Sequence, residues 1–215
     1  ANPDVLMAPA GAGSYEEGSE ATVSAYSPQT YDMYVYVFTD WDGDVADEYS
    51  LTTTVYMDAD KTVVANYQQM EEVTTAKSQG YWKNRAGLME LTLDDAEALN
   101  DVEPWLDYFD ETDLATFKSQ VKTYLTPKAK DPMQKKLGMQ LLTASLNVLH
   151  GYLDPTRDVW YDVDMDGVYD PAAETFNIGT VILNGIAAWS SGVDQAYYKD
   201  LLDWINSNEL LYIVY

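Results

Sequence analysis

The hydrophobic pattern changes its period near residue 80, and this change constrains the fold more than any other feature of the sequence. Before it, residue types alternate in short runs, which is typical of β-strands. The alternating positions are Val23, Ala25, Tyr34, Tyr36, Phe38, Thr52, Thr54 and Tyr56. Turn-forming residues such as Asp42-Gly43-Asp44 separate the runs. Residues 1–70 therefore predict a small antiparallel β domain.

After residue 80, apolar residues recur at helical spacing. Between Leu114 and Tyr124 they are three, four and three positions apart, which places them on one face of a helix. Helix starts are expected at Thr92, which acids follow, and at Asp131-Pro132, where a side-chain cap precedes proline at the first helical position. The helix that begins at Asp131-Pro132 is expected to cover residues 133–149, and two more are expected at residues 177–191 and 194–206.

These patterns predict an α+β fold with two domains. Residues 71–79 are polar with little periodicity, so we expect a linker there. Residues 80–215 are expected to form a mainly helical domain. Its last part, residues 209–215, is a short apolar run with high β-propensity and is expected to be a strand. That strand would add to the sheet of the first domain or pair with a neighbouring subunit.

Several short motifs occur in order within the first 70 residues. They are Gly13-Ser-Tyr15, Glu17-Gly18, Trp41-Asp-Gly-Asp44 and Val55-Tyr-Met-Asp-Ala-Asp-Lys-Thr-Val-Val-Ala-Asn-Tyr67. Together they resemble a divergent internalin-type B-repeat, in which a Met-Asp-x-Asp-Lys turn follows the tryptophan motif. The resemblance implies a β-grasp-like extracellular spacer rather than a catalytic unit. Trp41 is then expected to fill the core beside a tight turn.

A second set of motifs lies in the helical half. It consists of Gln79-Gly-Tyr-Trp-Lys-Asn84, Gln140-Leu-Leu-Thr-Ala-Ser-Leu-Asn-Val-Leu-His-Gly151 and Trp204-Ile-Asn206. Over residues 78–208 these resemble the GYWKNH-type domains of prokaryotic secreted proteins. The resemblance implies a surface or matrix protein of a family with no established catalysis. Arg85 stands where that motif has its histidine, so the role of the histidine does not carry over.

The segment from Asp162 to Asp170 carries the clearest chemical signal in the chain. If Asp162 is position 1, carboxylates fall at positions 1, 3, 5 and 9 and a glycine at position 6, the spacing of a calcium loop. The backbone carbonyl of Val168 is the expected ligand at position 7. We predict a structural Ca²⁺ site that stabilises the fold. Its expected ligands are Asp162, Asp164, Asp166, Val168, Asp170 and Glu174.

The loop also departs from a standard calcium loop. Position 12, which normally carries a bidentate glutamate, is Ala173, and Glu174 comes one residue later. Pro171 interrupts the expected exit helix. The alternative interpretation is a solvated acidic turn, although its carboxylates would then repel one another without a counter-ion.

A second acidic group has ligand-type residues without the full spacing of a calcium loop. It consists of Asp40, Asp42, Asp44, Asp47 and Glu48. Because it coincides with a turn of the B-repeat motif, a solvated loop is the favoured interpretation and a second cation the alternative.

The charge balance excludes some partners. The chain has 36 acidic and 12 basic residues and a net charge of −24. Such a surface repels phosphate backbones and anionic lipids, so we expect no nucleic-acid partner. No apolar run is long enough to span a membrane. There is no cysteine, which excludes disulfides, thiolate metal sites and cysteine nucleophiles. The chain begins at Ala1 without an initiator methionine, as expected of a secreted protein after signal-peptide removal.

Enzyme hypotheses find little support. His150 is the only histidine, and its place at the end of a predicted helix favours a charge interaction with the helix terminus over catalysis. No nucleophile elbow, phosphate loop or dinucleotide motif is present. Carboxylate pairs are numerous, but nothing in the sequence selects one of them for glycoside hydrolysis.

The sequence therefore predicts a non-enzymatic, extracellular cell-surface module with a structural or adhesive role. Its partners are expected to be copies of itself, as in a filament or matrix, or other surface proteins. The alternative is a calcium-dependent carbohydrate-binding module that uses aromatic platforms. The candidate platforms are Trp82, Trp105, Tyr108, Trp160, Tyr161 and Tyr169. A sugar site requires a coplanar, exposed aromatic pair, whereas a structural module would bury these rings.

Overall fold

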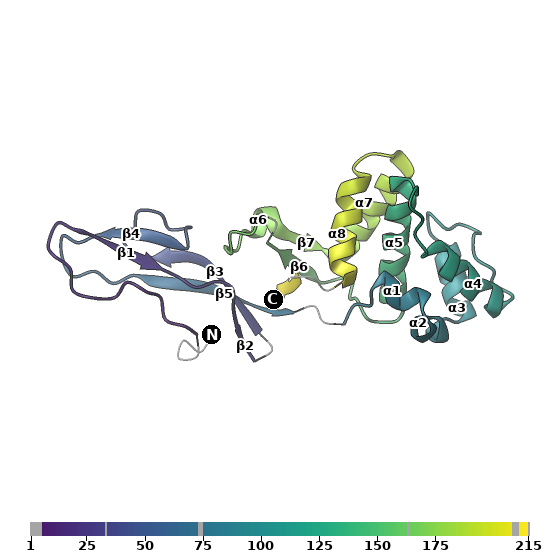
Figure 1. The fold of residues 1–215 in the computed structure, drawn as a ribbon, viewed down its shortest axis with the longest axis horizontal. Coiled ribbons are helices and arrows are strands. Elements are labelled where there is room, and N and C mark those ends of the chain that lie inside the picture. The colour runs from purple at the N-terminus through teal and green to yellow at the C-terminus, as the bar shows by residue number, and fades with distance from the viewer. Residues whose placement is uncertain (1–5, 33, 73–74, 163, 208–210, 215) are drawn as a thin grey trace. The chain divides into compact units, whose positions relative to one another are not determined.

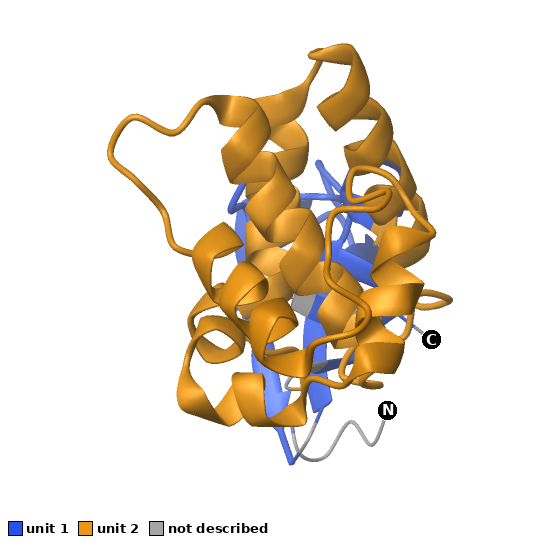
Figure 2. Cartoon of the chain, turned by 90° about the vertical axis from the view of Figure 1, so that its right-hand side faces the viewer, with its two compact units in different colours: residues 1–72, 158–175, 212–215 blue, residues 73–157, 176–211 orange. Residues whose placement is uncertain are grey.

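The chain forms two compact units in a computed structural model that describes residues 6–32, 34–72, 75–162, 164–207 and 211–214. Unit 1 comprises Ala1–Glu72, Asp158–Thr175 and Tyr212–Tyr215, and unit 2 comprises Val73–Arg157 and Phe176–Leu211 (Figure 2). The predicted α+β class is confirmed, with antiparallel sheets first and a mainly helical region after them. The division differs from the predicted one, because two later segments belong to the β unit.

The strands form two sheets (Figure 1). The smaller sheet pairs β1 (Glu20–Ser24) with β4 (Thr52–Tyr56). The larger has the order β2-β3-β5-β8-β6-β7. Its strands are β2 (Gln29–Tyr31), β3 (Tyr34–Asp42), β5 (Val64–Glu72), β6 (Asp158–Tyr161), β7 (Thr175–Asn177) and β8 (Leu211–Val214).

The late strand predicted at residues 209–215 is present as β8, although residues 209, 210 and 215 lie outside the described part of the chain. It pairs antiparallel with β5 of the same chain, so that Met70 is opposite Val214. Of the two pairings expected from the sequence, the structure therefore contains the one within the chain.

Strand β3 is buried on both of its faces because its alternating side chains contribute to two clusters. Phe38 packs with Trp41, Ala21, Val23 and Val55. Val35 and Val37 point to the other side, where they pack with Met70, Trp160 and Tyr212. A register shift between Phe38 and Asp40 marks a β-bulge in the pairing with β5. Trp41 is a core residue, as expected.

Unit 2 is built from helices, and α5 is its centre. The helices are α1 (Gln79–Lys83), α2 (Arg85–Glu90), α3 (Leu93–Asn100), α4 (Leu114–Tyr124), α5 (Met133–Leu149), α7 (Ile178–Ser191) and α8 (Gln195–Ser207). α6 (Pro171–Glu174) is a short helix of unit 1. α7 and α8 pack against α5 and against each other (Figure 1). Most α5 side chains from Leu137 to Asn147 are therefore buried.

Local capping chemistry explains where several helices begin and end. Thr92 and Asp95 form a reciprocal capping box at the start of α3, and the Asn177 side chain caps α7. The start of α5 corrects a prediction. Pro132 is its N-cap residue and no side-chain cap is present, because the Asp131 carboxylate accepts a hydrogen bond from the backbone of Lys128 instead.

The segment expected to be a linker is mostly built into the two units. β5 continues through Glu72, and residues 73 and 74 lie outside the described part of the chain. Ala76 is buried, and the backbone of Lys77 is hydrogen-bonded to the Asn147 side chain within unit 2.

Candidate functional site

Three of the predicted ligands converge in the loop that follows β6. Asp162, Asp164 and Asp166 each offer a carboxylate oxygen, and these oxygens lie within 4.8 Å of one another. Two oxygens on opposite sides of a calcium ion are separated by about 4.6–5.2 Å, twice the usual ligand distance. The spacing of the three oxygens is therefore compatible with a shared divalent cation.

Backbone hydrogen bonds set the shape of the loop. The Asp166 N–H donates to Asp162 Oδ1 at 3.1 Å and to Asp164 Oδ1 at 3.2 Å, and the Gly167 N–H donates to Asp162 Oδ2 at 3.0 Å. Met165 and Gly167 both have positive φ, of 61° and 75°. Glycine adopts this conformation without steric cost, which explains the residue at position 6.

The loop is attached to the β core of unit 1. The Ser27 hydroxyl donates to the Gly167 carbonyl at 2.5 Å and accepts from the Phe38 N–H at 2.9 Å. The Tyr169 N–H donates to the Phe38 carbonyl at 2.7 Å, and the Val168 side chain packs against the Phe38 cluster. A cation bound in this loop would therefore stabilise an insertion into the first unit rather than a part of the helical unit.

The two other predicted carboxylate ligands have partners of their own. Asp170 Oδ1 accepts from the backbone of Ala172 and Ala173 and so caps α6. Glu174 is only 4 % exposed and accepts from Trp160 Nε1 at 2.8 Å. Both nevertheless line a cavity of about 490 Å³, which Asp164 and Asp166 also line. Their part in coordination, and that of the Val168 carbonyl, stays a prediction.

The electrostatics of the loop favour a cation. Partial burial raises the pKa of Asp162 above its ordinary value, and the neighbouring Asp166 and Asp164 charges add to this effect. The ionised loop therefore lacks compensating positive charge, and a divalent cation would supply it.

The carboxylates of the second acidic group do not gather around a common point as those of the 162–166 loop do. Asp44 pairs with Lys61 at 2.5 Å, Asp40 accepts from the Asn66 amide at 3.1 Å, and Asp47 accepts from the Tyr49 backbone at 3.1 Å. Within the described residues, the 162–166 loop is the only place where three potential ligands meet. Lys61 also pairs with Asp58 at 2.8 Å. Both residues belong to the Met-Asp-x-Asp-Lys motif, so this ion pair stabilises the turn that the motif forms.

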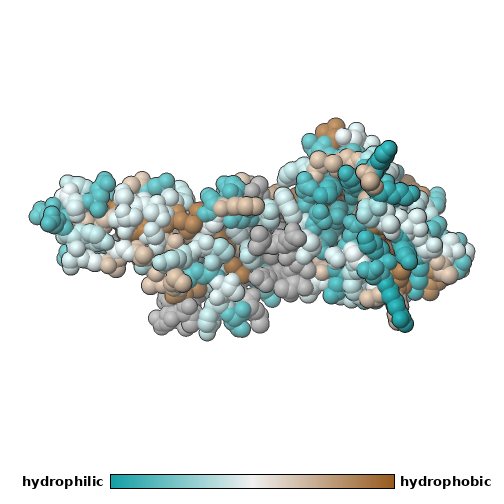
Figure 3. Space-filling view, in the orientation of Figure 1, coloured by the Kyte–Doolittle hydropathy of each residue, from teal (hydrophilic) through white to brown (hydrophobic). Residues whose placement is uncertain are grey.

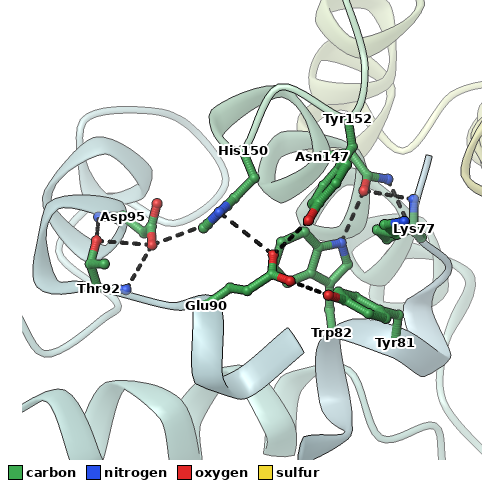
Figure 4. A network of polar contacts seen from close by, with 9 residues as sticks. All are labelled: Lys77, Tyr81, Trp82, Glu90, Thr92, Asp95, Asn147, His150 and Tyr152. Atoms are coloured by element: carbon green, nitrogen blue, oxygen red, sulfur yellow. Dashed lines mark hydrogen bonds and ion pairs between the residues drawn. The ribbon is translucent and has the colours of Figure 1, made fainter. Parts of the chain in front are cut away.

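Sequence reasoning missed a buried polar network in unit 2. Asn147 Oδ1 accepts from Trp82 Nε1 at 3.1 Å and from the Lys77 backbone at 2.9 Å (Figure 4). Asn147 Nδ2 donates to Asn206 Oδ1 at 3.1 Å, and Asn206 in turn donates to the Gln140 side chain at 3.0 Å. The three motifs quoted from the helical half are thus joined by one chain of hydrogen bonds. The Asn and Gln residues within these motifs were the signal by which the sequence could have indicated the network.

His150 lies beside this network, between two carboxylates. Its Nε2 is 3.2 Å from Asp95 Oδ2 and its Nδ1 is 3.9 Å from Glu90 Oε2. Glu90 also accepts from the hydroxyls of Tyr81 and Tyr152 (Figure 4). The bond to Glu90 raises the pKa of Tyr81. Glu90 belongs to α2, Asp95 to α3, and His150 is the C-cap residue of α5. Because the two histidine nitrogens face separate carboxylates, the contacts of His150 join these three helices.

Most of the candidate sugar platforms are buried. Trp82, Trp105, Trp160 and Tyr161 are core residues, whereas Tyr108 is 46 % exposed. Tyr108 meets Phe109 and Tyr124 edge-on, and Tyr169 meets Trp160 edge-on. The stacked pair that the described residues do contain, Trp160 with Tyr212, is buried.

Comparisons with protein-family models, curated proteins and solved structures find no match to this chain. The two family resemblances therefore depend on the quoted motifs alone. In the part of the chain that the structure describes, no helix combines the length and the apolar character needed to cross a bilayer.

Proposed function

We propose that this protein is an extracellular structural or adhesive module in which a calcium ion in the 162–174 loop stabilises unit 1. The observation that carries the proposal is the convergence of Asp162, Asp164 and Asp166 within 4.8 Å in a loop hydrogen-bonded to the β core. Bound calcium would join the segment between β6 and α6 to strands that lie more than 100 residues earlier in the chain.

The charge of the chain supports an environment rich in cations. At −24, the protein needs counter-ions to limit its self-repulsion, and extracellular fluids supply divalent ones. Hydrophilic and intermediate residues cover most of the face drawn in Figure 3, and strongly hydrophobic residues occupy only small areas of it.

The carbohydrate-binding alternative is less well supported. It requires coplanar, exposed rings, whereas the aromatic residues that suggested it are mostly in the core and meet their neighbours edge-on. Ring burial of this kind contributes to the stability of the fold. Association of copies into a filament stays part of the proposal, and electron microscopy of the purified protein with and without calcium tests it.

Thermal unfolding with EDTA and with about 5 mM calcium tests the calcium site. At a calcium concentration about a hundred times the Kd, binding to the folded state adds about 2.7 kcal/mol. For a chain of this size we expect the unfolding midpoint to rise by roughly 5–10 °C. Asp164→Asn with Asp166→Asn should abolish the rise, because both carboxylate charges are removed while the side-chain shapes are kept.

Glu16→Gln with Glu17→Gln is the matched control. It removes the same number of exposed acidic charges from unit 1, outside the loop, so its response to calcium should equal that of the wild type. A wild-type midpoint that does not respond to calcium would contradict the site. An equal response in the loop variant would place the bound calcium elsewhere.

A further inference from the structure

Helix α7 is unusual in this acidic protein because it contains no charged residue from Ile178 to Ser191. Its exposed positions carry the apolar Leu183 and Ala187 beside the uncharged polar Thr180 and Asn184. α7 buries one face against α5 and α8, but its other face is open, and Leu183 there is 68 % exposed. Exposed apolar surface of this kind indicates an interaction site.

The open face of α7 forms one wall of an apolar groove. The groove has a volume of about 360 Å³ and lies between α7, the end of α5 and the end of α3, all within unit 2. Its apolar lining includes Leu99, Val102, Val148, Leu149, Ile182 and Leu183. α3 and α7 each pack against α5, and the lining residues come from these three helices and from the segments that follow α3 and α5.

The α3 wall of the groove belongs to a strongly acidic segment of the chain. The segment 86–117, which contains α3, has ten Asp and Glu residues and no Lys or Arg. Glu97, Asp101 and Glu103 of this segment are exposed next to the lining residues Leu99 and Val102. The opposite wall, α7, carries no charge. An occupant would therefore meet an apolar surface with negative charge along one side.

We propose that this groove binds an amphipathic helix of another protein, with apolar side chains at i, i+3, i+4 and i+7 and Lys or Arg beside them. The apolar anchors would fill the groove, and the basic residues would lie against the α3 wall. A second copy of this chain fits less well, because it would bring another acidic segment and a net charge of −24 to the same place. This inference is independent of the calcium loop.

Fluorescence anisotropy with a labelled synthetic leucine–lysine helix of that pattern tests the proposal. Near physiological salt, Leu183→Asp should weaken binding about tenfold or more, because it places a charge in the apolar contact on the uncharged α7 wall. Glu97→Lys with Asp101→Lys should weaken binding and reduce its dependence on salt. Circular dichroism verifies that each variant is folded.

Two controls separate the groove from simple charge attraction. Val193→Asp changes another exposed apolar residue of unit 2, 62 % exposed and outside the groove, and should leave binding unchanged. A serine–lysine peptide of equal charge should bind at least tenfold more weakly. Equal binding by both peptides, or by wild type and Leu183→Asp, would overturn the proposal. So would a wild-type dimer that Leu183→Asp dissociates, because a second copy would then occupy the groove.

Discussion

The buried side chain of Asn147 joins three segments of unit 2 by hydrogen bonds, which no pattern in the sequence around it predicts. Its side chain bonds the backbone of Lys77 twice, the indole of Trp82 and the amide of Asn206. Buried polar groups stabilise a fold only when their partners are present, and an unpaired one costs its full desolvation. The network thereby fixes how the 77–82 segment, α5 and α8 pack together.

Asn147→Ala is expected to lower the free energy of unfolding by about 3 kcal/mol or more, because it leaves several buried donors and acceptors without partners. Urea denaturation measures the loss. Asn184→Ala, an exposed asparagine of α7, is the control and should change the stability by less than about 0.5 kcal/mol. Similar effects of the two substitutions would show that the network contributes little.

At the scale of elements, several helices meet their neighbours through aromatic and charged side chains together. The Lys135 ammonium of α5 lies 3.0 Å from the centre of the Tyr124 ring of α4. The ring face favours the charged form of the lysine. Burial acts the other way and lowers the pKa of Lys135 to about 8, more than the nearby Asp131 raises it.

This shift predicts a pH dependence. Between about pH 8 and the ordinary lysine pKa of 10.5, the unfolded chain binds more protons at Lys135 than the folded chain does. The cost of burying the charge is therefore present in full below about pH 8 and is relieved as the pH rises. Relative to Lys135→Met, the wild type should gain stability between about pH 7 and pH 9.5.

Thermal midpoints of the two proteins across that range measure the effect. Lys136→Met, at the exposed neighbouring position, is the control and should keep a constant difference from the wild type. If the wild type lost stability relative to Lys135→Met as the pH rose, the attraction of the Tyr124 ring would outweigh burial.

On the scale of the whole molecule, the chain passes between its two units four times rather than once. It crosses after Glu72, Arg157, Thr175 and Leu211. The second and third crossings bracket the acidic loop, and the fourth leads to β8, which pairs with β5. Unit 1 is therefore completed by segments that the ribosome makes after most of unit 2.

The net charge of −24 acts on the whole molecule as well. In the presence of EDTA, raising NaCl from about 20 mM to about 500 mM should raise the unfolding midpoint by several degrees, because salt screens repulsion among the acidic side chains. KCl should act equally, since screening does not depend on the identity of the monovalent cation. A midpoint that stays constant or falls would mean that the acids contribute no net repulsion in the folded state.

The sequence by itself determined the local structure. The period of its hydrophobic residues indicated strands before residue 80 and helices after it, and Thr92 with the acids after it marked the start of α3. The spacing of the aspartates predicted the three-carboxylate cluster. Such signals survive in a sequence because each depends on residues within a few positions of one another.

Tertiary structure alone decided which segments belong together. The acidic loop could not be assigned to unit 1 from its spacing, because its attachment depends on Ser27 and Phe38, far away in the sequence. Asp170 also caps α6 and Glu174 also accepts a hydrogen bond from the Trp160 indole, contacts that the ligand pattern did not predict. Asn147 likewise acquires its role from residues about 60 to 70 positions away. Long-range contacts of this kind leave no period in the sequence, so only the packed chain reveals them.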